Sequence, residues 1–241
     1  MNYLKSMLTN LGLPCGGDVI EQFEQYRRSI LKWNESVNLT AVRDEESFEI
    51  RHFADSLMIC RSPRMGQARR VIDVGTGAGF PGIPLAIVFP EKQFTLMDSL
   101  GKRMKIVEQT AHEISLQNVE VIHARAEELG KKKEYREQYD LCVSRAVANL
   151  SVLSEYCLPF VKVGGWFAPY KTAAAEEEIR EGRKAVEILG GRLLDDRIHF
   201  DLKEIRDEEK LEHTILWIEK ITNTLTKYPR KAGTPAKDPL K

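Results

Sequence analysis

The stretch VIDVGTGAGFPGIPLA, residues 71–86, constrains the fold of this chain more than any other feature. A short apolar run, VIDV, leads directly into a loop with several glycines, and an apolar segment typical of a helix follows. Glycine suits such a loop because it permits a tight turn and lets a ligand approach the backbone closely. The pattern therefore predicts a strand, a ligand-binding turn and a helix.

Two glycine fingerprints overlap in this loop. Gly75, Gly77 and Gly79 form G-x-G-x-G, which is typical of S-adenosylmethionine-dependent methyltransferases. With Gly82, the last two of these also form G-x-G-x-x-G, the fingerprint of dinucleotide-binding folds. The apolar run ends at Gly75, so a dinucleotide register would begin two residues late. The first register is therefore favoured.

Two carboxylates also favour a methyl donor. Asp73 lies just before the glycines, where its charge repels a pyrophosphate but stabilises the ammonium and sulfonium groups of S-adenosylmethionine. Asp98 ends the next predicted strand, FTLMD, where it is placed to accept hydrogen bonds from a ribose, as either cofactor requires. We therefore expect S-adenosylmethionine to bind at Asp73, Gly75, Gly77 and Asp98.

The rest of the chain alternates between strand-like and helix-like segments. FTLMD, VEVIHA and YDLCVSRAV read as strands, and KRMKIVEQTAHEISL between the first two reads as a helix. This alternation predicts an α/β, Rossmann-like fold with a mostly parallel seven-stranded sheet and helices on both faces. A helix over TAAAEEEIREGRKAVEILGG is expected to end in a left-handed cap at Gly190. RLLDDRIHFDL and HTILWIEK have no helical pattern between them, so we expect a hairpin at the sheet edge.

Three regions are expected along the chain: a helical N-terminal extension over 1–65, a methyltransferase domain over 66–220 and a basic tail over 221–241. In the extension, DVIEQFEQYRRSILKWNESV opens with Asp18 in a cap-like position and repeats apolar residues at helical spacing. The whole chain is neutral, with 36 basic and 36 acidic residues, but from Lys220 onward six basic residues face Asp238 alone, a net charge of +5. Any contact with a polyanion must therefore come from a local patch.

Several classes of protein are excluded by what the sequence lacks. The four cysteines and five histidines show no metal-ligand spacing, so we expect neither a metal site nor a disulfide. We also expect no signal peptide and no membrane span, because no apolar run has the required length. These expectations describe a cytoplasmic protein, which we take to be a monomer.

The residues after the fourth predicted strand bear on the methyl acceptor, because that strand's carboxyl end faces the transferred group. They read YDLCVSRAVANL and lack the Asn or Asp followed by two prolines and an aromatic that exocyclic-amine methylation uses. Cys142 is expected to pack in the core rather than to attack a pyrimidine ring. What remains is an acceptor with its own lone pair, such as a ring nitrogen, which needs no general base; a small-molecule acceptor fits this argument equally well.

At these residues the sequence resembles the 16S ribosomal RNA guanine-N(7)-methyltransferases, a family also called glucose-inhibited division protein B. The resemblance is weakest over 192–212 and is carried by WNESVNLTA, RHFADSL, DVGTGAGFPGIPLA, DSLGKR, ARAEE, SRAV and RKAGTPAKDPL. It implies transfer of a methyl group from S-adenosylmethionine to N(7) of a guanine in 16S rRNA of the small ribosomal subunit. It also implies a cofactor site near Asp98 that includes Gly75, Phe80, Ala126, Glu127 and Arg145.

The resemblance suggests roles for individual side chains. The Glu127 carboxylate is placed to meet the adenine amine, and Arg145 is expected to orient the guanine. Methylation makes that ring cationic, so a direct charge contact from Arg145 would not help. His52 and Asp55 are three residues apart on a predicted helix and are expected on the substrate side, with a purely structural pair as the alternative. Lys171 is expected to contact an RNA phosphate.

The basic tail is expected to contact RNA through Arg230, Lys231 and Lys237. We expect it to be dispensable for cofactor binding, because the glycine loop lies elsewhere in the chain. Two alternatives stay open: a methyltransferase that acts on a small molecule or protein, and a nucleotide-sensing module without catalysis. The positive charge of the tail supports RNA as the acceptor, because an enzyme that methylates a small molecule needs no phosphate-binding arm.

Overall fold

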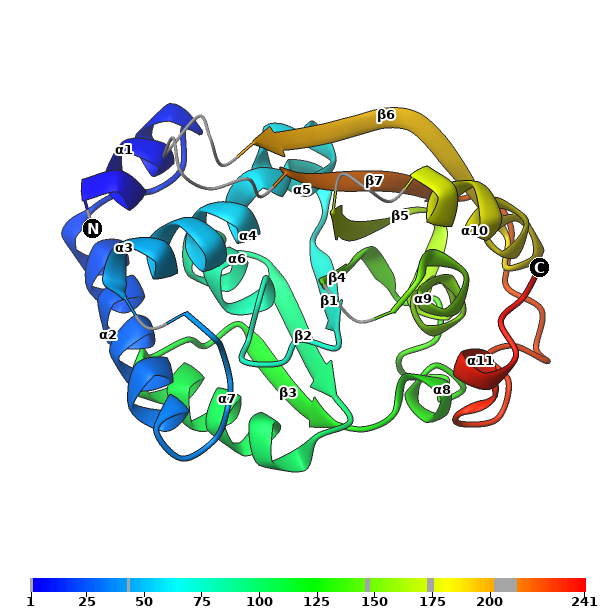
Figure 1. Cartoon of the computed structure of the whole chain (residues 1–241), viewed down its shortest axis with the longest axis horizontal. Coiled ribbons are helices and arrows are strands. Elements are labelled where there is room, and N and C mark those ends of the chain that lie inside the picture. The colour runs from blue at the N-terminus through cyan, green and yellow to red at the C-terminus, as the bar shows by residue number, and fades with distance from the viewer. Residues whose placement is uncertain (1, 43, 146–147, 173–175, 202–211) are drawn as a thin grey trace.

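A seven-stranded sheet runs through the middle of the computed structural model, which describes residues 2–42, 44–145, 148–172, 176–201 and 212–241 (Figure 1). The strand order is β3-β2-β1-β4-β5-β7-β6. Strands β1 to β5 are parallel, whereas β7 runs antiparallel to both β5 and β6. The predicted mostly parallel sheet and the hairpin at its edge are confirmed. The strands are β1 Arg70–Val74, β2 Gln93–Asp98, β3 Val119–His123, β4 Tyr139–Arg145, β5 Val161–Thr172, β6 Gly191–Asp201 and β7 Glu212–Lys220.

Helical segments precede the first strand and connect the others. Those before β1 are α1 Asn2–Asn10, α2 Gly17–Asn34, α3 Glu45–Phe48, the π-helix η1 Glu49–Ala54, α4 Asp55–Leu57, the 3₁₀-helix η2 Met58–Arg61 and α5 Pro63–Gln67. Those after β1 are α6 Gly82–Val88, α7 Gly101–Glu113, α8 Ala126–Leu129, α9 Leu150–Cys157, the 3₁₀-helix η3 Leu158–Phe160, α10 Glu176–Ile188 and α11 Thr234–Lys237. None of the helices in the described ranges combines the length and apolarity that crossing a bilayer requires.

Two predicted helix ends can be compared with the structure. Asp18 is not the cap of α2: the helix begins after Gly16, and Asp18 lies in its first turn, where a carboxylate still favours the positive end of the helix. The cap after α10 is confirmed, because Gly190 has a φ of 86°. The expected start of that helix at 173–175, and the end of the fourth predicted strand at 146–147, lie outside the described residues.

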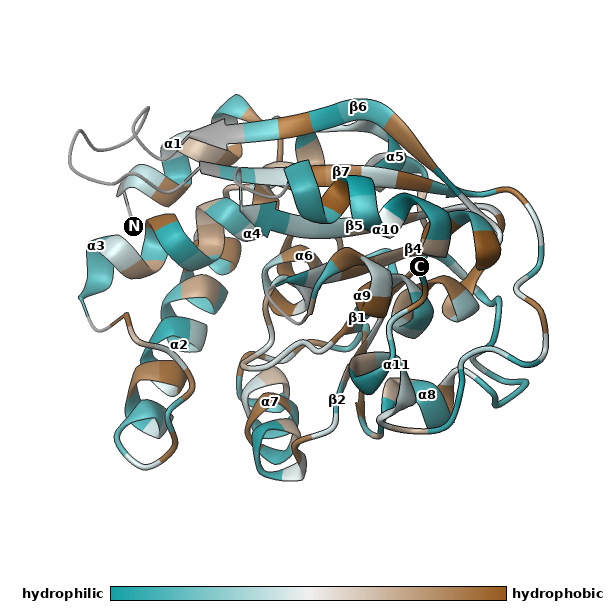
Figure 2. Cartoon of the chain, turned by 45° about the vertical axis from the view of Figure 1, so that its right-hand side comes forward, coloured by the Kyte–Doolittle hydropathy of each residue, from teal (hydrophilic) through white to brown (hydrophobic). Residues whose placement is uncertain are grey.

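Helices cover both faces of the sheet. Successive residues of a strand point to opposite faces, so neighbouring strand residues pack against different helices. Val71 packs in a buried cluster with the N-terminal helices, α6 and α7, whereas its neighbour Ile72 packs in a second cluster with α8, α9 and α10. The outer helices, such as α2 and α10, show both hydrophilic and hydrophobic residues in Figure 2, as helices with one buried side should. The N-terminal helices therefore share a core with the sheet.

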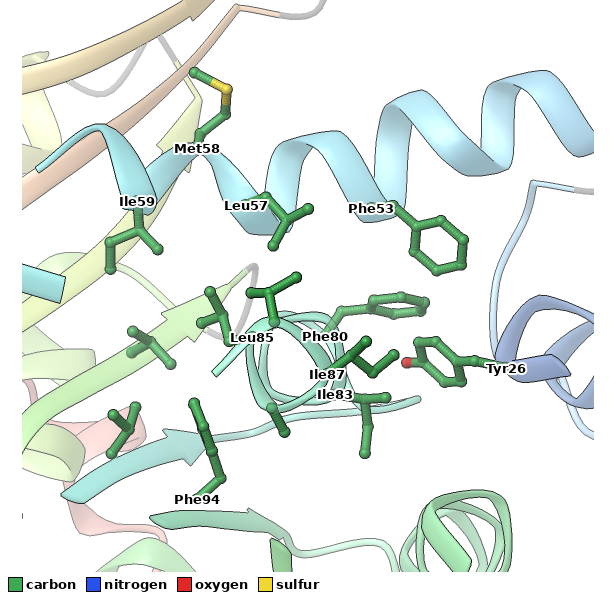
Figure 3. Close-up of a cluster of buried hydrophobic side chains, with 14 of the residues drawn as sticks. Tyr26, Phe53, Leu57, Met58, Ile59, Phe80, Ile83, Leu85, Ile87 and Phe94 are labelled. Atoms are coloured by element: carbon green, nitrogen blue, oxygen red, sulfur yellow. The ribbon is translucent and has the colours of Figure 1, made fainter. Parts of the chain in front are cut away.

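An aromatic group joins the N-terminal helices to the glycine loop. Figure 3 shows Tyr26, Phe53 and Phe80 turned toward one another, from α2, η1 and the loop before α6. The ring centroids of Tyr26 and Phe80 are 5.2 Å apart, and the Tyr26 hydroxyl donates a hydrogen bond to the carbonyl of Ala78. The N-terminal helices therefore support the loop that follows β1.

Candidate functional site

The loop after β1 adopts a conformation that requires its glycines. Gly75, Gly77 and Gly79 have φ angles of 74°, 60° and 101°, a region that L side chains rarely adopt. Gly82 is needed for a different reason: a Cβ there would lie 2.1 Å from a methyl carbon of Leu96 and 2.9 Å from Asp73 Oδ2. The overlapping fingerprints thus separate into three turn glycines and one packing glycine.

Asp73 organises this loop from the end of β1. Its Oδ2 accepts hydrogen bonds from Thr76 Oγ1 at 2.7 Å and from the amide of Gly82 at 2.8 Å. The residue is 1% exposed, and Oδ1 has no partner within the part of the chain that the structure describes. Burial raises the pKa of Asp73 to about 7, although the two hydrogen bonds act against this shift. A buried carboxyl oxygen without a partner can accept a cationic or hydrogen-bonding group of a ligand.

Asp98 holds the loop from the neighbouring strand β2. Its Oδ2 accepts a hydrogen bond from the amide of Gly77 at 3.1 Å, and its Oδ1 accepts one from the amide of Leu100 at 2.9 Å. A carboxylate has about four lone-pair sites, so Asp98 can still accept hydrogen bonds from a ribose. The two aspartates therefore fix the loop from both strands.

A cavity of about 390 Å³ opens beside this loop, where β1, β2 and β3 end. It has the volume of a small-molecule site and the position that open α/β sheets use for ligands. Four residues predicted for the cofactor site line it: Gly75, Asp98, Ala126 and Glu127. Sequence reasoning missed Tyr156 of α9 and two residues of the C-terminal segment, Gly233 and Ala236, which also line it.

Two residues assigned to the cofactor site by resemblance, Phe80 and Arg145, do not line this cavity within the described ranges. The Phe80 ring packs among the N-terminal aromatics and is stacked on His52, with centroids 4.6 Å apart. Arg145, at the end of β4, lies over the Phe80 ring, with Cζ 5.1 Å from its centroid. The structure therefore places both residues in a separate group at the end of β4, the strand that pairs with β1.

Arg145 brings the two predicted substrate-side residues together. Its Nη1 donates to Asp55 Oδ2 at 2.7 Å, and its Nη2 lies 3.4 Å from His52 Nδ1. Since a guanidinium only donates, Nδ1 accepts, and Nε2 of the ring carries the proton that it donates to Thr40 Oγ1 at 2.6 Å. Burial and the charge of Arg145 lower the pKa of His52 to about 3, so this imidazole is neutral near pH 7.

Asp55 is the acidic centre of this group and is 1% exposed. Burial alone raises the pKa of Asp55, but the hydrogen bond from His213 and the charge of Arg145 outweigh burial and hold it below its usual value. His213 of β7 donates from Nδ1 to Asp55 Oδ1 at 2.6 Å. Nothing in the sequence pointed to His213, which lies 158 positions further along the chain.

A second cavity of about 200 Å³ lies against this group, and its lining includes Arg145, His213, Tyr170 and Lys171. Lys171 is not free to meet a phosphate as expected, because it pairs with Glu178 at 2.6 Å and donates to the carbonyl of Ala148 at 2.5 Å. Its side chain is 9% exposed. A phosphate contact at Lys171 would have to displace Glu178.

The basic tail is not the free arm that its charge suggested. Arg230 donates from Nε and Nη2 to the carboxylate of Glu155, which is fully buried in α9. Lys220 is also fully buried, donates to the carbonyl of Leu158 at 2.6 Å, and has a pKa lowered by burial to about 8. Lys231 and Lys237 are exposed, and the structure gives neither of them an ion pair within its described ranges.

The cysteines show no arrangement for covalent catalysis. Cys142 is fully buried in β4, as expected, and burial raises the pKa of its thiol well above the usual value. All four cysteines are free, and no group of three or more metal-ligating side chains occurs among the described residues.

Comparison with known proteins agrees with this geometry. The family model described as GidB, rRNA small subunit methyltransferase G, matches residues 19–205. A protein named Ribosomal RNA small subunit methyltransferase G from Alkaliphilus metalliredigens is 46% identical, over 99% of this chain and 98% of its own. One of the same name from Clostridium tetani is 44% identical, over the same shares.

Solved structures show the fold. An O-methyltransferase from Bacillus cereus in complex with SAH superposes with a TM-score of 0.58 at 14% identity, over 90% of this chain and 97% of that one. A SAM-dependent O-methyltransferase from Thermotoga maritima gives a TM-score of 0.51 at 16% identity, over 71% and 66%. The predicted Rossmann-like methyltransferase fold is therefore confirmed, and by its sequence the chain belongs to the rRNA small subunit methyltransferase G family.

Proposed function

We propose that this protein transfers a methyl group from S-adenosylmethionine to N(7) of a guanine in the 16S rRNA of the small ribosomal subunit, in the cytoplasm. One observation carries the proposal: in a chain of this family, β1 ends at the cavity beside the glycine loop, and its parallel neighbour β4 ends at Arg145, the centre of a separate polar group. A two-substrate transfer needs a cofactor site and an acceptor site side by side.

The residues around the first cavity fit S-adenosylmethionine, which supplies an electrophilic methyl group on a sulfonium. Asp73 does not line the cavity within the described residues, but it directly precedes the lining residue Val74 and keeps a buried oxygen without a described partner, which suits the ligand's ammonium group. Asp98 and Glu127 provide carboxylate oxygens for hydroxyl and amine groups, and Gly75 exposes backbone without a side chain in the way. Arg103 and Arg125 also line the cavity, so these carboxylates act there as hydrogen-bond acceptors and do not give the cavity a net negative charge.

The Arg145 group fits the acceptor side. Asp55 and the neutral His52 hold the guanidinium in place, so Arg145 presents a fixed planar donor rather than a mobile charge. Such a group can orient a guanine without taking a proton from it. A ring nitrogen attacks with its own lone pair, so no general base is required.

RNA contact is proposed for Lys231 and Lys237, which are exposed on the C-terminal segment. Arg230 is withdrawn from this role, because its guanidinium is held by Glu155 and by Asp238. Each exposed lysine that meets a phosphate releases counterions and makes binding salt-dependent.

Transfer of tritium from methyl-labelled S-adenosylmethionine tests the proposal. The protein is incubated with small ribosomal subunits, naked 16S rRNA, large subunits and a mixture of low-mass metabolites, and each fraction is counted separately. We expect label in 16S rRNA, free or assembled. Label only in protein or low-mass material would support the alternative acceptors, and binding without any transfer would support a sensing module.

A further inference from the structure

The cofactor cavity has a wall that comes from the end of the chain. Gly233, which immediately precedes the short helix α11, and Ala236, which lies within α11, line the cavity together with Gly75 of the glycine loop. In both Figure 1 and Figure 2, α11 lies beside α8, the helix that carries Glu127. The segment is therefore part of the cavity and not an appendage to it.

A hydrogen bond joins this segment to the carboxylate that faces the cavity. The amide of Gly233 donates to Glu127 Oε1 at 2.8 Å, and Glu127 is 5% exposed. Gly233 has a φ of 80°, a region that favours glycine, so the backbone geometry that directs this amide depends on the residue type. Among the described residues Glu127 Oε2 accepts no hydrogen bond, so this second oxygen can meet a ligand.

Several contacts hold the segment in place. At its start, Arg230 pairs with the buried Glu155 at 2.8 Å. Just before it, Arg136 donates to the carbonyls of Thr224 at 2.6 Å and Tyr228 at 2.9 Å. Near the terminus, the hydroxyl of Ser151 donates to the carbonyl of Leu240. A segment anchored before and after α11 can serve as a fixed surface for a ligand.

We propose that residues 230–237 form part of the cofactor-binding site, with Gly233 positioning Glu127 and Ala236 in contact with the bound nucleoside. The proposal rests on the proposed function, because it takes the ligand to be S-adenosylmethionine or its demethylated product. It differs from the expectation that the tail is dispensable for cofactor binding. A tail that serves only RNA contact or solubility would leave the affinity for a small ligand unchanged.

The test adds bulk to the cavity wall and measures binding of S-adenosylhomocysteine by calorimetry. Ala236→Trp places a large side chain at an exposed position that lines the cavity, and we expect affinity to fall by about tenfold or more. Leu225→Trp is the matched control, because Leu225 is 58% exposed, lies in the same C-terminal region and does not line the cavity. Equal affinities of the two variants would overturn the inference.

Two further measurements make the result unambiguous. Where Ala236→Trp unfolds at a lower temperature than the parent protein, Ala236→Leu replaces it, with the same expected direction. Hydrogen exchange of the intact chain should slow over 230–237 when S-adenosylhomocysteine is added, and stay unchanged over α10. Unchanged exchange over 230–237 with bound ligand would contradict the inference, whereas failure of the intact chain to bind would overturn the proposed function itself.

Discussion

Asp55 accepts hydrogen bonds from two basic side chains at once, Arg145 at 2.7 Å and His213 at 2.6 Å. The carboxylate is buried, and its partners come from β4 and β7, which β5 separates in the sheet. Asp55 therefore positions Arg145 at the end of β4, next to β1, and ties the N-terminal helices to the sheet.

Asp55→Asn should lower both stability and methyl transfer. Loss of the charge leaves Arg145 half-buried without its counterion, and breaking a buried pair costs about 3 kcal/mol. Urea unfolding measures this cost. The control is Asp196→Asn, which breaks the exposed pair with Arg64 and should cost less than about 1 kcal/mol. Affinity for S-adenosylhomocysteine should stay within about threefold of the parent, because Asp55 does not line that cavity. Normal turnover in a stably folded Asp55→Asn protein would contradict the positioning role.

Binding of the cofactor should release a proton near neutral pH. Because the pKa of Asp73 is raised to about 7, most protein molecules carry a protonated Asp73 at pH 6.5. A bound ammonium group favours the charged form of this carboxyl. Affinity should therefore rise as pH increases from 6 to 8. Calorimetry in buffers of different ionisation enthalpy measures the released proton, and Asp73→Asn should abolish the release. The same affinity and proton release in both proteins would show that Asp73 does not face the ligand's cation.

His52 should make stability depend on pH. Its pKa is about 3 in the folded protein and about 6.5 when unfolded, so between these values only the unfolded chain binds the proton. The contribution of His52 is thus fully present above pH 6.5 and is lost as pH falls toward 3, by about 1.4 kcal/mol per pH unit.

Asp73 has the opposite effect on stability. Its raised pKa stabilises the protonated folded state, and that contribution is lost as pH rises from about 4 to 7. Comparing the parent with His52→Gln isolates the effect of His52, because Asp73 is present in both proteins. The difference in unfolding free energy between parent and His52→Gln should shrink as pH falls from 7 to 4. A difference that stays constant with pH would show that folding does not lower the pKa of His52.

The two exposed lysines of the tail should affect RNA and not the cofactor. Replacing Lys231 and Lys237 with alanine should reduce the slope of log affinity against log salt by about 0.7 to 0.9 for each phosphate that the protein no longer neutralises. Filter binding to 16S rRNA over a salt series measures the slope, with Lys184→Ala on α10 as the control. An unchanged slope in the double variant would remove the tail from the RNA interface.

Much of the fold was readable from the sequence because it depends on local patterns. Short sequence patterns predict the positive φ angles at Gly75 and Gly77, the alternation of strands and helices, and the turn at Gly190. The interactions that complete the site are not local. Glu127 meets Gly233 across 106 positions, and the partner of Arg230 is an acidic residue inside α9 that looks like any helical glutamate. Net charge suggested a free basic tail, but charge does not reveal which lysines and arginines find buried partners.

The identity of the methylated atom decides whether this protein transfers the methyl group to N(7) of a guanine. Small-subunit RNA methylated by this protein with labelled S-adenosylmethionine is treated by mild reduction, and cleavage of the chain at the labelled nucleotide is measured. We expect cleavage at one labelled guanine, because a guanine methylated at N(7) is a cation whose glycosidic bond becomes labile. Label that stays in uncleaved RNA, or that appears on another base, would contradict it.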